Sequence, residues 1–220
     1  NTGNDDSQFE MLKSLELTYE NHGILIEYCE SKNIKFLSTA FDFESIEFLK
    51  DKLDFYKIPS GEITNLPYLE KVANLGLSIV MSTGMATMQE VKEAMKVLTT
   101  NGIDKKNITI LHCNTEYPTP MNDVNLRAML SIEKELGVKI GYSDHTLGIE
   151  IPIAAVAMGA KIIEKHITLD RKMKGTDQAG SLSIDGINRM VRDIRNLESS
   201  FGEEKIVIED AVKNAREKLE

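Results

Sequence analysis

Residues 138–168 read VKIGYSDHTLGIEIPIAAVAMGAKIIEKHIT and contain the unit that decides the fold. Two short apolar runs, Val138–Tyr142 and Lys161–His166, are typical of buried strands. The segment between them, Leu147–Met158, is apolar on most faces and predicts a well-buried helix. A strand, a helix and a second strand in this order favour a parallel pair joined by a right-handed crossover.

The same alternation runs along the whole chain. Short apolar runs predict six strands, at Lys35–Ser38, Phe55–Ile58, Ser78–Met81, Ile108–His112, Val138–Tyr142 and Lys161–His166. Helical patterns lie between them, at 8–32, 42–52, 65–74, 88–99, 122–136, 147–158 and 183–198. Thr87 and Glu90 form a capping box at the start of one of these helices. This order admits two folds, an open doubly wound sheet and a (β/α)8 barrel.

The loops distinguish the two folds. Loops that lead into the strands contain no motif that suggests chemistry. Loops that leave the strands are dense in reactive residues, as in PSGEITN, STGMAT, NTEYPTP and SDHTLG. In a barrel all such loops converge on one mouth, while an open sheet uses mainly its switch point. We therefore expect a TIM barrel that lacks its first two strands in this chain. It would occupy residues 1–200, with a helical tail or linker at 201–220.

Composition excludes several functional classes. The net charge of −9, from 26 basic and 35 acidic residues without a basic cluster, argues against nucleic-acid binding. No apolar run approaches the roughly 20 residues needed to span a bilayer, and the polar N-terminus does not resemble a signal peptide. Two cysteines do not make a disulfide framework. We expect a cytoplasmic protein that does not bind membranes.

Two of the four histidines end neighbouring predicted strands. His145 and His166 would project from strands about 4.8 Å apart, so both imidazoles can reach one metal ion. Asp144 and Glu164 are candidates to orient them. The alternative is two unrelated, hydrogen-bonded histidines.

A second group of candidates combines hydroxyls with one lysine. Hydroxyls and backbone amides around a lysine can hold a phosphate or carboxylate. Ordinary turn chemistry is the alternative for each hydroxyl. The members are Thr39, Lys57, Ser60, Ser82, Thr83 and Ser143. Tyr117, next to two prolines that stiffen its loop, could position a substrate or pack beneath the loop.

Six motifs in order resemble the sialic acid synthase family, which includes the legionaminic and pseudaminic acid synthases. They are FLSTAFD, YKIPSGEITNLPYLEKVA, MSTGMAT, LHCNTEYPTP, GYSDHTLG and IEKHITLD. The resemblance implies a barrel enzyme that condenses phosphoenolpyruvate with an open-chain 2-acetamido sugar. The products would be a sialic-acid-like nine-carbon sugar acid and phosphate. It also implies a divalent metal, usually Mn²⁺, and a homodimer.

The resemblance assigns roles position by position. His145 and His166 match metal ligands. The positions that match phosphoenolpyruvate-binding residues are Thr39, Lys57, Ser60, Ser82 and Ser143. Asn4, Tyr117 and Asp177 match sugar-contacting residues, and Glu62 or Asp177 could handle protons, with Tyr117 beside them in the catalytic group.

The chain also departs from the family pattern. Members normally begin with a segment that holds two further barrel strands, and end in a small antifreeze-like domain; neither is expected in this sequence. Two other functions therefore stay open. One is a different metal-assisted barrel aldolase or phosphosugar synthase, which a requirement for pyruvate would reveal. The other is a non-catalytic truncated barrel module.

Overall fold

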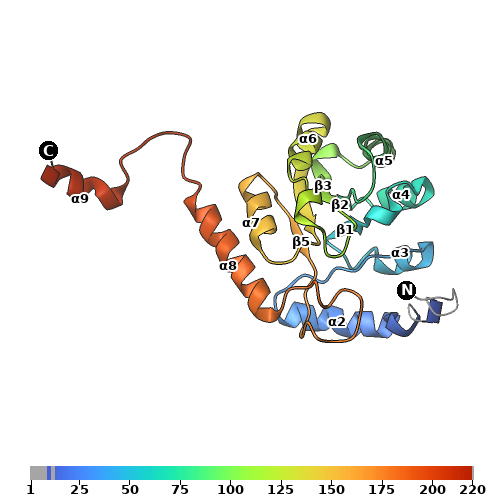
Figure 1. Ribbon diagram of the computed structural model, residues 1–220. Coiled ribbons are helices and arrows are strands. Elements are labelled where there is room, and N and C mark those ends of the chain that lie inside the picture. Colours follow the sequence, from blue (N-terminus) through green and yellow to red (C-terminus); the bar gives the residue numbers. More distant parts are fainter. Residues whose placement is uncertain (1–8, 11–12, 220) are drawn as a thin grey trace.

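A single parallel sheet forms the centre of the computed structural model, which describes residues 9–10 and 13–219. Its five strands lie in the order of the sequence (Figure 1). They are β1 (Phe55–Ile58), β2 (Ser78–Ser82), β3 (Ile108–Cys113), β4 (Lys139–Asp144) and β5 (Ile163–Lys165). Parallel neighbours require a crossover between each pair, which sends every loop that follows a strand to the same edge of the sheet.

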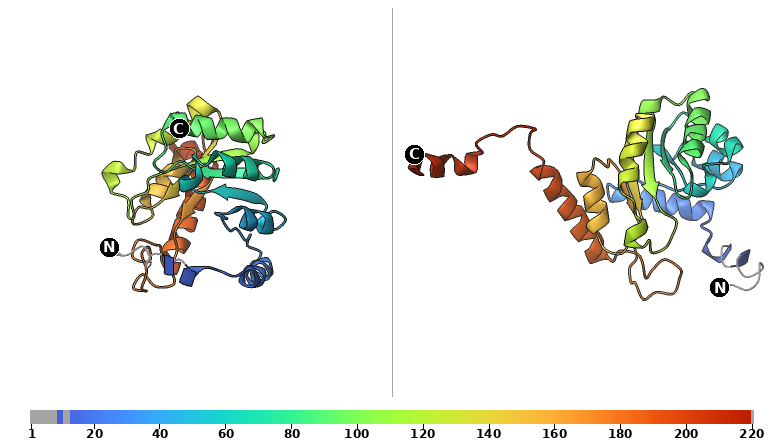
Figure 2. Two further views of the ribbon diagram at one scale, coloured as in Figure 1. Left: turned by 90° about the vertical axis from the view of Figure 1, so that its right-hand side faces the viewer. Right: turned by 45° about the horizontal axis from the view of Figure 1, so that its top comes forward.

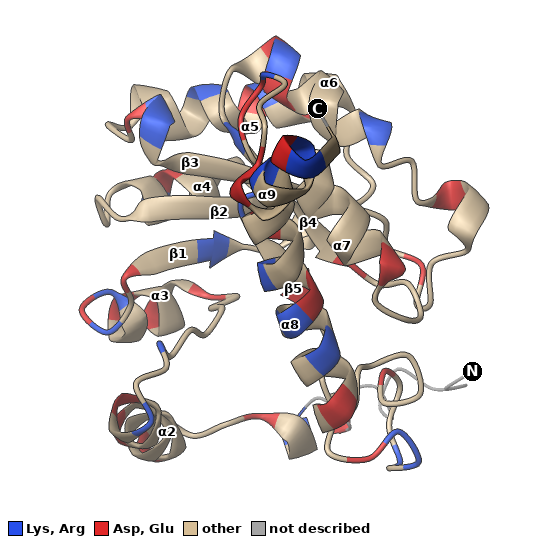
Figure 3. Cartoon of the chain, turned by 90° about the vertical axis from the view of Figure 1, so that its left-hand side faces the viewer, with Lys and Arg blue, Asp and Glu red and all other residues tan. Residues whose placement is uncertain are grey.

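The described helices are α2 (Tyr19–Ser31), α3 (Phe43–Leu49), α4 (Leu66–Ala73), α5 (Met88–Thr100), α6 (Arg127–Leu136), α7 (Glu150–Ala157), α8 (Ile184–Ser200) and α9 (Asp210–Leu219). The helices α4 to α7 provide the crossovers, and the remaining helices precede β1 or follow β5. Figures 1 and 2 show α8 beside α7, and α9 extending away from the rest of the chain. In Figure 3 the strands are largely free of charged residues, whereas the helices carry both signs. This distribution places the apolar core between the sheet and its helices.

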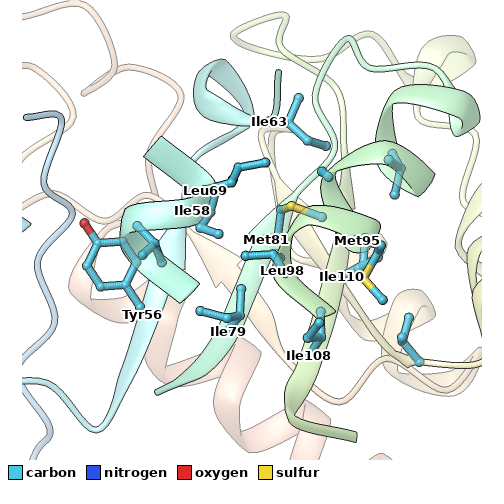
Figure 4. Close-up of a cluster of buried hydrophobic side chains, with 14 of the residues drawn as sticks. Tyr56, Ile58, Ile63, Leu69, Ile79, Met81, Met95, Leu98, Ile108 and Ile110 are labelled. Atoms are coloured by element: carbon cyan, nitrogen blue, oxygen red, sulfur yellow. The ribbon is translucent and has the colours of Figure 1, made fainter. Parts of the chain in front are cut away.

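The core is built by alternate strand residues that face the helices (Figure 4). Because side chains alternate along a strand, one residue in two points outward to α3–α7. These residues are fully or almost fully buried, and they are Tyr56, Ile58, Ile79, Met81, Ile108, Ile110, Ile140 and Tyr142. The intervening residues face the other side of the sheet, so polar side chains there do not compete with the core.

The sheet is strongly curled. Four strand spacings separate β1 from β5, or about 19 Å if the sheet were flat. Nevertheless, the Lys57 ammonium on β1 lies 3.5 Å from the Glu164 carboxylate on β5. The five strands therefore form a half-barrel whose concave face brings its two edge strands together.

Five of the six predicted strands are confirmed, and the predicted strand Lys35–Ser38 is wrong. Residues 34–40 run extended without pairing to a strand in the described part of the chain. Phe36 packs against the core, and the Ala40 carbonyl accepts a hydrogen bond from Tyr68 at 2.6 Å. An extended segment becomes a strand only through a hydrogen-bonded neighbour, and apolar character alone does not supply one. The described residues thus form a curled five-stranded sheet and not a full TIM barrel.

Two predicted helices are interrupted in the structure. The pattern over 8–32 is interrupted at 16–18, and α2 begins after Thr18, whose side chain accepts from the Asn21 amide. The pattern over 122–136 divides into a 3-10 turn at Met121–Asp123 and α6. By contrast, the capping box of Thr87 and Glu90 is confirmed at the start of α5.

Two further observations concern the chain as a whole. Cys29 is half-buried and Cys113 buried, and both are free thiols. Within the described residues, every helix is too short or too polar to cross a membrane.

Candidate functional site

A pocket opens at the carboxyl ends of β4 and β5. Its walls come from the loop after β3, from the ends of β4 and β5, and from the loop that follows β5. Among its lining residues are Tyr117, His145, His166 and Asp177. Chain segments far apart in the sequence therefore converge here, as parallel topology requires.

His145 and His166 lie face to edge in this pocket. Their ring centroids are 5.4 Å apart and the rings are inclined by 77°. Asp144 and Lys165 are register partners in the β4–β5 ladder, and each histidine is the next residue of its chain. With metal–nitrogen bonds of about 2.1 Å, two imidazoles on one ion place their ring centroids roughly 5 Å apart. The observed separation fits a shared divalent ion.

The backbone sets the orientation of His145. Its Nδ1 lies 2.5 Å from the Asn114 carbonyl oxygen, which can only accept, so Nδ1 carries the proton. The lone pair of Nε2 is then available to a metal. Burial lowers the pKa of His145 below its usual value, despite the hydrogen bond to Asn114, and keeps the ring neutral.

His166 has a carboxylate as its neighbour. Its Nδ1 lies 3.6 Å from Oδ2 of Asp177, at ion-pair rather than hydrogen-bond distance. The same carboxylate lines the pocket. Asp177 is therefore placed to face both the imidazole and a bound molecule.

Tyr117 covers the histidine pair. Its ring centroid is 4.0 Å from that of His145 and 5.6 Å from that of His166. Burial raises the pKa of Tyr117, so the phenol stays protonated and can donate a hydrogen bond. Its side of the pocket is aromatic and can contact the carbon face of a sugar.

Polar groups gather on the concave face beside this pocket. The Ser143 hydroxyl donates to Glu164 at 2.7 Å, and Lys57 lies 3.5 Å from the same carboxylate. Ser82 is 3% exposed, and within the described residues its hydroxyl has no hydrogen-bond partner. A buried unpaired hydroxyl beside a lysine is suited to an anion that supplies the missing acceptor.

The loop after β2 is fastened to β3 by Cys113. The Cys113 amide donates to Thr83 Oγ1 at 3.3 Å, and its sulfur accepts from the Gly84 amide at 3.0 Å. Gly84 has φ +52°, and a Cβ there would lie 2.4 Å from Ser60 Cβ. Glycine is therefore required for the loops after β1 and β2 to approach each other. Sequence reasoning missed both Gly84 and Cys113, although STGM is itself a turn signal.

Two further candidates, Thr39 and Glu62, do not line the pocket. Thr39 is half-buried in the extended segment 34–40. Glu62 ends a 3-10 turn and accepts a hydrogen bond from Asn65 at 2.7 Å. Asn4 lies outside the described residues.

Within the described residues, neither Asp144 nor Glu164 orients a histidine ring by a direct hydrogen bond. Asp144 pairs with Lys165, and Glu164 binds Ser143. The Asn114 carbonyl takes this role for His145, and a backbone carbonyl leaves no signature in a sequence. In the described ranges, no three His, Cys, Asp or Glu residues cluster as metal ligands, so the candidate metal centre consists of two histidines.

Solved structures share this fold over nearly the whole chain. The sialic acid synthetase of Leptospira borgpetersenii, solved with citrate, superposes with a TM-score of 0.88 at 32% identity, covering 99% of this chain and 75% of that one. A truncated 3-deoxy-D-arabino-heptulosonate 7-phosphate synthase from Thermotoga maritima gives a TM-score of 0.72 at 20% identity, over 84% of this chain and 73% of that one. The second likeness establishes the fold alone.

Curated relatives are similar over most of this chain. The N,N'-diacetyllegionaminic acid synthase of Campylobacter jejuni is 50% identical over 92% of the chain and 61% of its own length. The human N-acetylneuraminate-9-phosphate synthase is 37% identical over 86% of the chain and 53% of its own length. The chain thus spans little more than half the length of these relatives. Because the NeuB family model matches residues 1–206, the chain belongs to the NeuB family.

Proposed function

We propose that this chain is the barrel portion of a synthase that condenses phosphoenolpyruvate with an open-chain 2-acetamido sugar. The products are a sialic-acid-like nine-carbon sugar acid and phosphate. One observation carries the proposal: the polar group around Lys57 and Ser143, which we call the anion cradle, lies beside the histidine pair at the same edge of the sheet. Membership of the NeuB family supports it, as do the names of the relatives.

The anion cradle would bind phosphoenolpyruvate. Lys57, whose side chain is 13% exposed, supplies the positive charge. Ser82 and Ser143 supply hydroxyl donors from β2 and β4. Ser60 would add a hydroxyl from the turn that Gly84 contacts, and Thr39 one from the extended segment. Charge-assisted hydrogen bonds to phosphate or carboxylate are the strong ones, so Lys57 should dominate affinity.

His145 and His166 would hold a divalent ion, for which Mn²⁺ is the leading candidate. Two nitrogen ligands leave several positions for water and substrate oxygens. When bound, the ion would polarise the sugar aldehyde as a Lewis acid. The chain's own contribution is to orient the rings, which the Asn114 carbonyl does for His145.

Tyr117 and Asp177 would bind the sugar. The Tyr117 ring packs on His145 and presents a protonated phenol. Asp177 lines the pocket and can accept from sugar hydroxyls or move a proton, whereas Glu62 is hydrogen-bonded to Asn65 outside the lining. We therefore assign the proton-handling role to Asp177. Asn4 stays a proposed sugar contact.

The reaction balances as follows. C3 of phosphoenolpyruvate forms a bond to the aldehyde carbon, whose oxygen takes up a proton. Water adds to C2, and one of its protons balances the proton that the aldehyde oxygen takes up. The C2–O bond then breaks and phosphate leaves with its bridging oxygen, while the new C2 hydroxyl becomes the keto group and its proton passes to the phosphate. Lys57 and the cradle hydroxyls would hold the departing phosphate, and Asp177 the proton near the sugar oxygen.

The proposal includes a homodimer in the cytoplasm, an expectation that rests on the family resemblance. Light scattering of the purified chain measures its mass in solution and checks the dimer. A measured mass that corresponds to one chain would contradict the proposed homodimer.

The test is phosphate release from phosphoenolpyruvate by the purified chain with Mn²⁺. The acceptor panel should include the sugar precursors of N,N'-diacetyllegionaminic acid and N-acetylneuraminic acid. We expect release with one acceptor and its loss on addition of a chelator. The proposal would be contradicted if no acceptor gave phosphate release, even after the chain was extended by the further segments that its relatives have. Turnover with pyruvate instead would indicate an aldolase.

A further inference from the structure

A buried ion pair is formed by the two residues that immediately precede His145 and His166. Nζ of Lys165 is 2.5 Å from Oδ2 of Asp144, and the two side chains are 3% and 0% exposed. Both residues line the same pocket as His145 and His166. None of the roles assigned above uses this pair.

The pair fixes the chain on both sides of His145. Oδ1 of Asp144 accepts from the Thr146 amide at 3.0 Å and from the Thr146 hydroxyl at 2.8 Å. The Lys165 ammonium also donates to the Thr146 carbonyl. The residues before and after His145 are thus tied to one network, and the backbone at His145 has little freedom to move.

The same pair fixes the chain just before His166. Asp144 and Lys165 are the last register partners of the β4–β5 ladder. After this pair of residues both strands end and continue as loops, whose first residues are His145 and His166. An ion pair at this last register position therefore fixes the backbone from which both imidazole side chains project.

Stability alone does not account for such a pair. Burying two charges carries a desolvation cost that their attraction largely cancels, and apolar replacements are often as stable. The best-supported use of buried polar groups is to specify register. Groups behind a metal site commonly orient its ligands, and replacing them weakens metal binding about 10- to 100-fold.

We propose that Asp144 and Lys165 form a positioning pair that sets the separation and orientation of His145 and His166. The inference rests on the proposed function where it concerns metal affinity. The arrangement of the metal-free rings tests it separately.

The decisive variant is Asp144→Asn with Lys165→Met. Asparagine keeps an acceptor for Thr146, and methionine keeps much of the lysine volume, so neither change leaves a buried unpaired charge. The matched control is Lys92→Met with Glu135→Gln, which removes an exposed ion pair of 2.5 Å between α5 and α6.

Two measurements decide the question. The first is the nuclear Overhauser effect between the His145 and His166 rings in histidine-labelled, metal-free protein. The second is Mn²⁺ affinity, measured from free Mn²⁺ by electron paramagnetic resonance. In the double variant we expect the ring-to-ring effect to disappear and the affinity to fall about 10- to 100-fold. The control should keep both.

A folded double variant with unchanged ring contacts and unchanged affinity would overturn the inference. If it does not fold, Thr146→Val decides, because it removes one link of the network and leaves both charges in place. We expect it to weaken Mn²⁺ binding several-fold and the ring contacts with it; no change would overturn the inference. If the unaltered chain binds no Mn²⁺, the metal part of the proposed function fails and the ring contacts alone decide.

Discussion

Lys57 and Glu164 come from the first and last strands of the sheet, yet their charged groups lie 3.5 Å apart. Only a curled sheet allows this contact, so the pair reports that the concave face is formed. Lys57, a candidate anion-binding residue, therefore already has the Glu164 carboxylate as a neighbour, and an incoming anion must displace that carboxylate or share the lysine with it.

Glu164→Gln should therefore strengthen phosphoenolpyruvate binding. The change removes the charge that competes for Lys57, while an amide can still accept from Ser143. Because the Glu164 side chain is 42% exposed, solvent screens the pair, and we expect a gain of about three- to fivefold. Isothermal titration measures the Kd. Weaker binding in the variant would show that Glu164 assists the anion rather than competing with it.

Gly84→Ala should destabilise the protein more than Gly76→Ala does. Both glycines have positive φ, at +52° and +70°, but only Gly84 has a close neighbour, Ser60. Strain alone costs about 1 kcal/mol at Gly76, whereas the clash raises the cost at Gly84 to about 2–4 kcal/mol. Urea unfolding measures both variants. Equal losses of unfolding free energy would contradict the close approach of Gly84 and Ser60.

His112 should make stability fall in mild acid. Its Nε2 lies 3.0 Å from the Val124 carbonyl, and burial lowers the pKa of His112 below its ordinary 6.5. Because the folded-state pKa is lowered, stability is complete above pH 6.5 and declines as the unfolded chain takes up the proton first.

The measurement is the free energy of unfolding at pH 7.5 and pH 5.5. His112→Gln should reduce the difference between the two values, and His22→Gln on α2 serves as the matched control. If the His112 variant shows the same pH dependence as the unaltered chain, the burial of a neutral ring is refuted.

Much of the sheet could be predicted from sequence because its strands are short apolar runs bounded by turn residues. The segment Lys35–Ser38 has the same character but has no pairing neighbour among the residues that the structure describes, and pairing is a tertiary property that composition does not encode. For the same reason the number of strands was overestimated.

The site was predictable in its residue types but not in its contacts. The two histidines were placed together by parallel topology. Alternation along a strand turns consecutive side chains apart, so a direct hydrogen bond from Asp144 to the His145 ring was not to be expected. The Asn114 carbonyl could not be anticipated, because every residue carries one.

Whether the histidine pair and the anion cradle form one site is tested most directly by ³¹P relaxation of bound phosphoenolpyruvate in the presence of Mn²⁺. A paramagnetic ion held by His145 and His166 should strongly enhance the relaxation of phosphorus held near Lys57. The enhancement should disappear in His145→Ala, which should still bind phosphoenolpyruvate through the cradle. If both ligands bind without enhancement, or if His145→Ala retains it, the two sites are separate and the account is wrong.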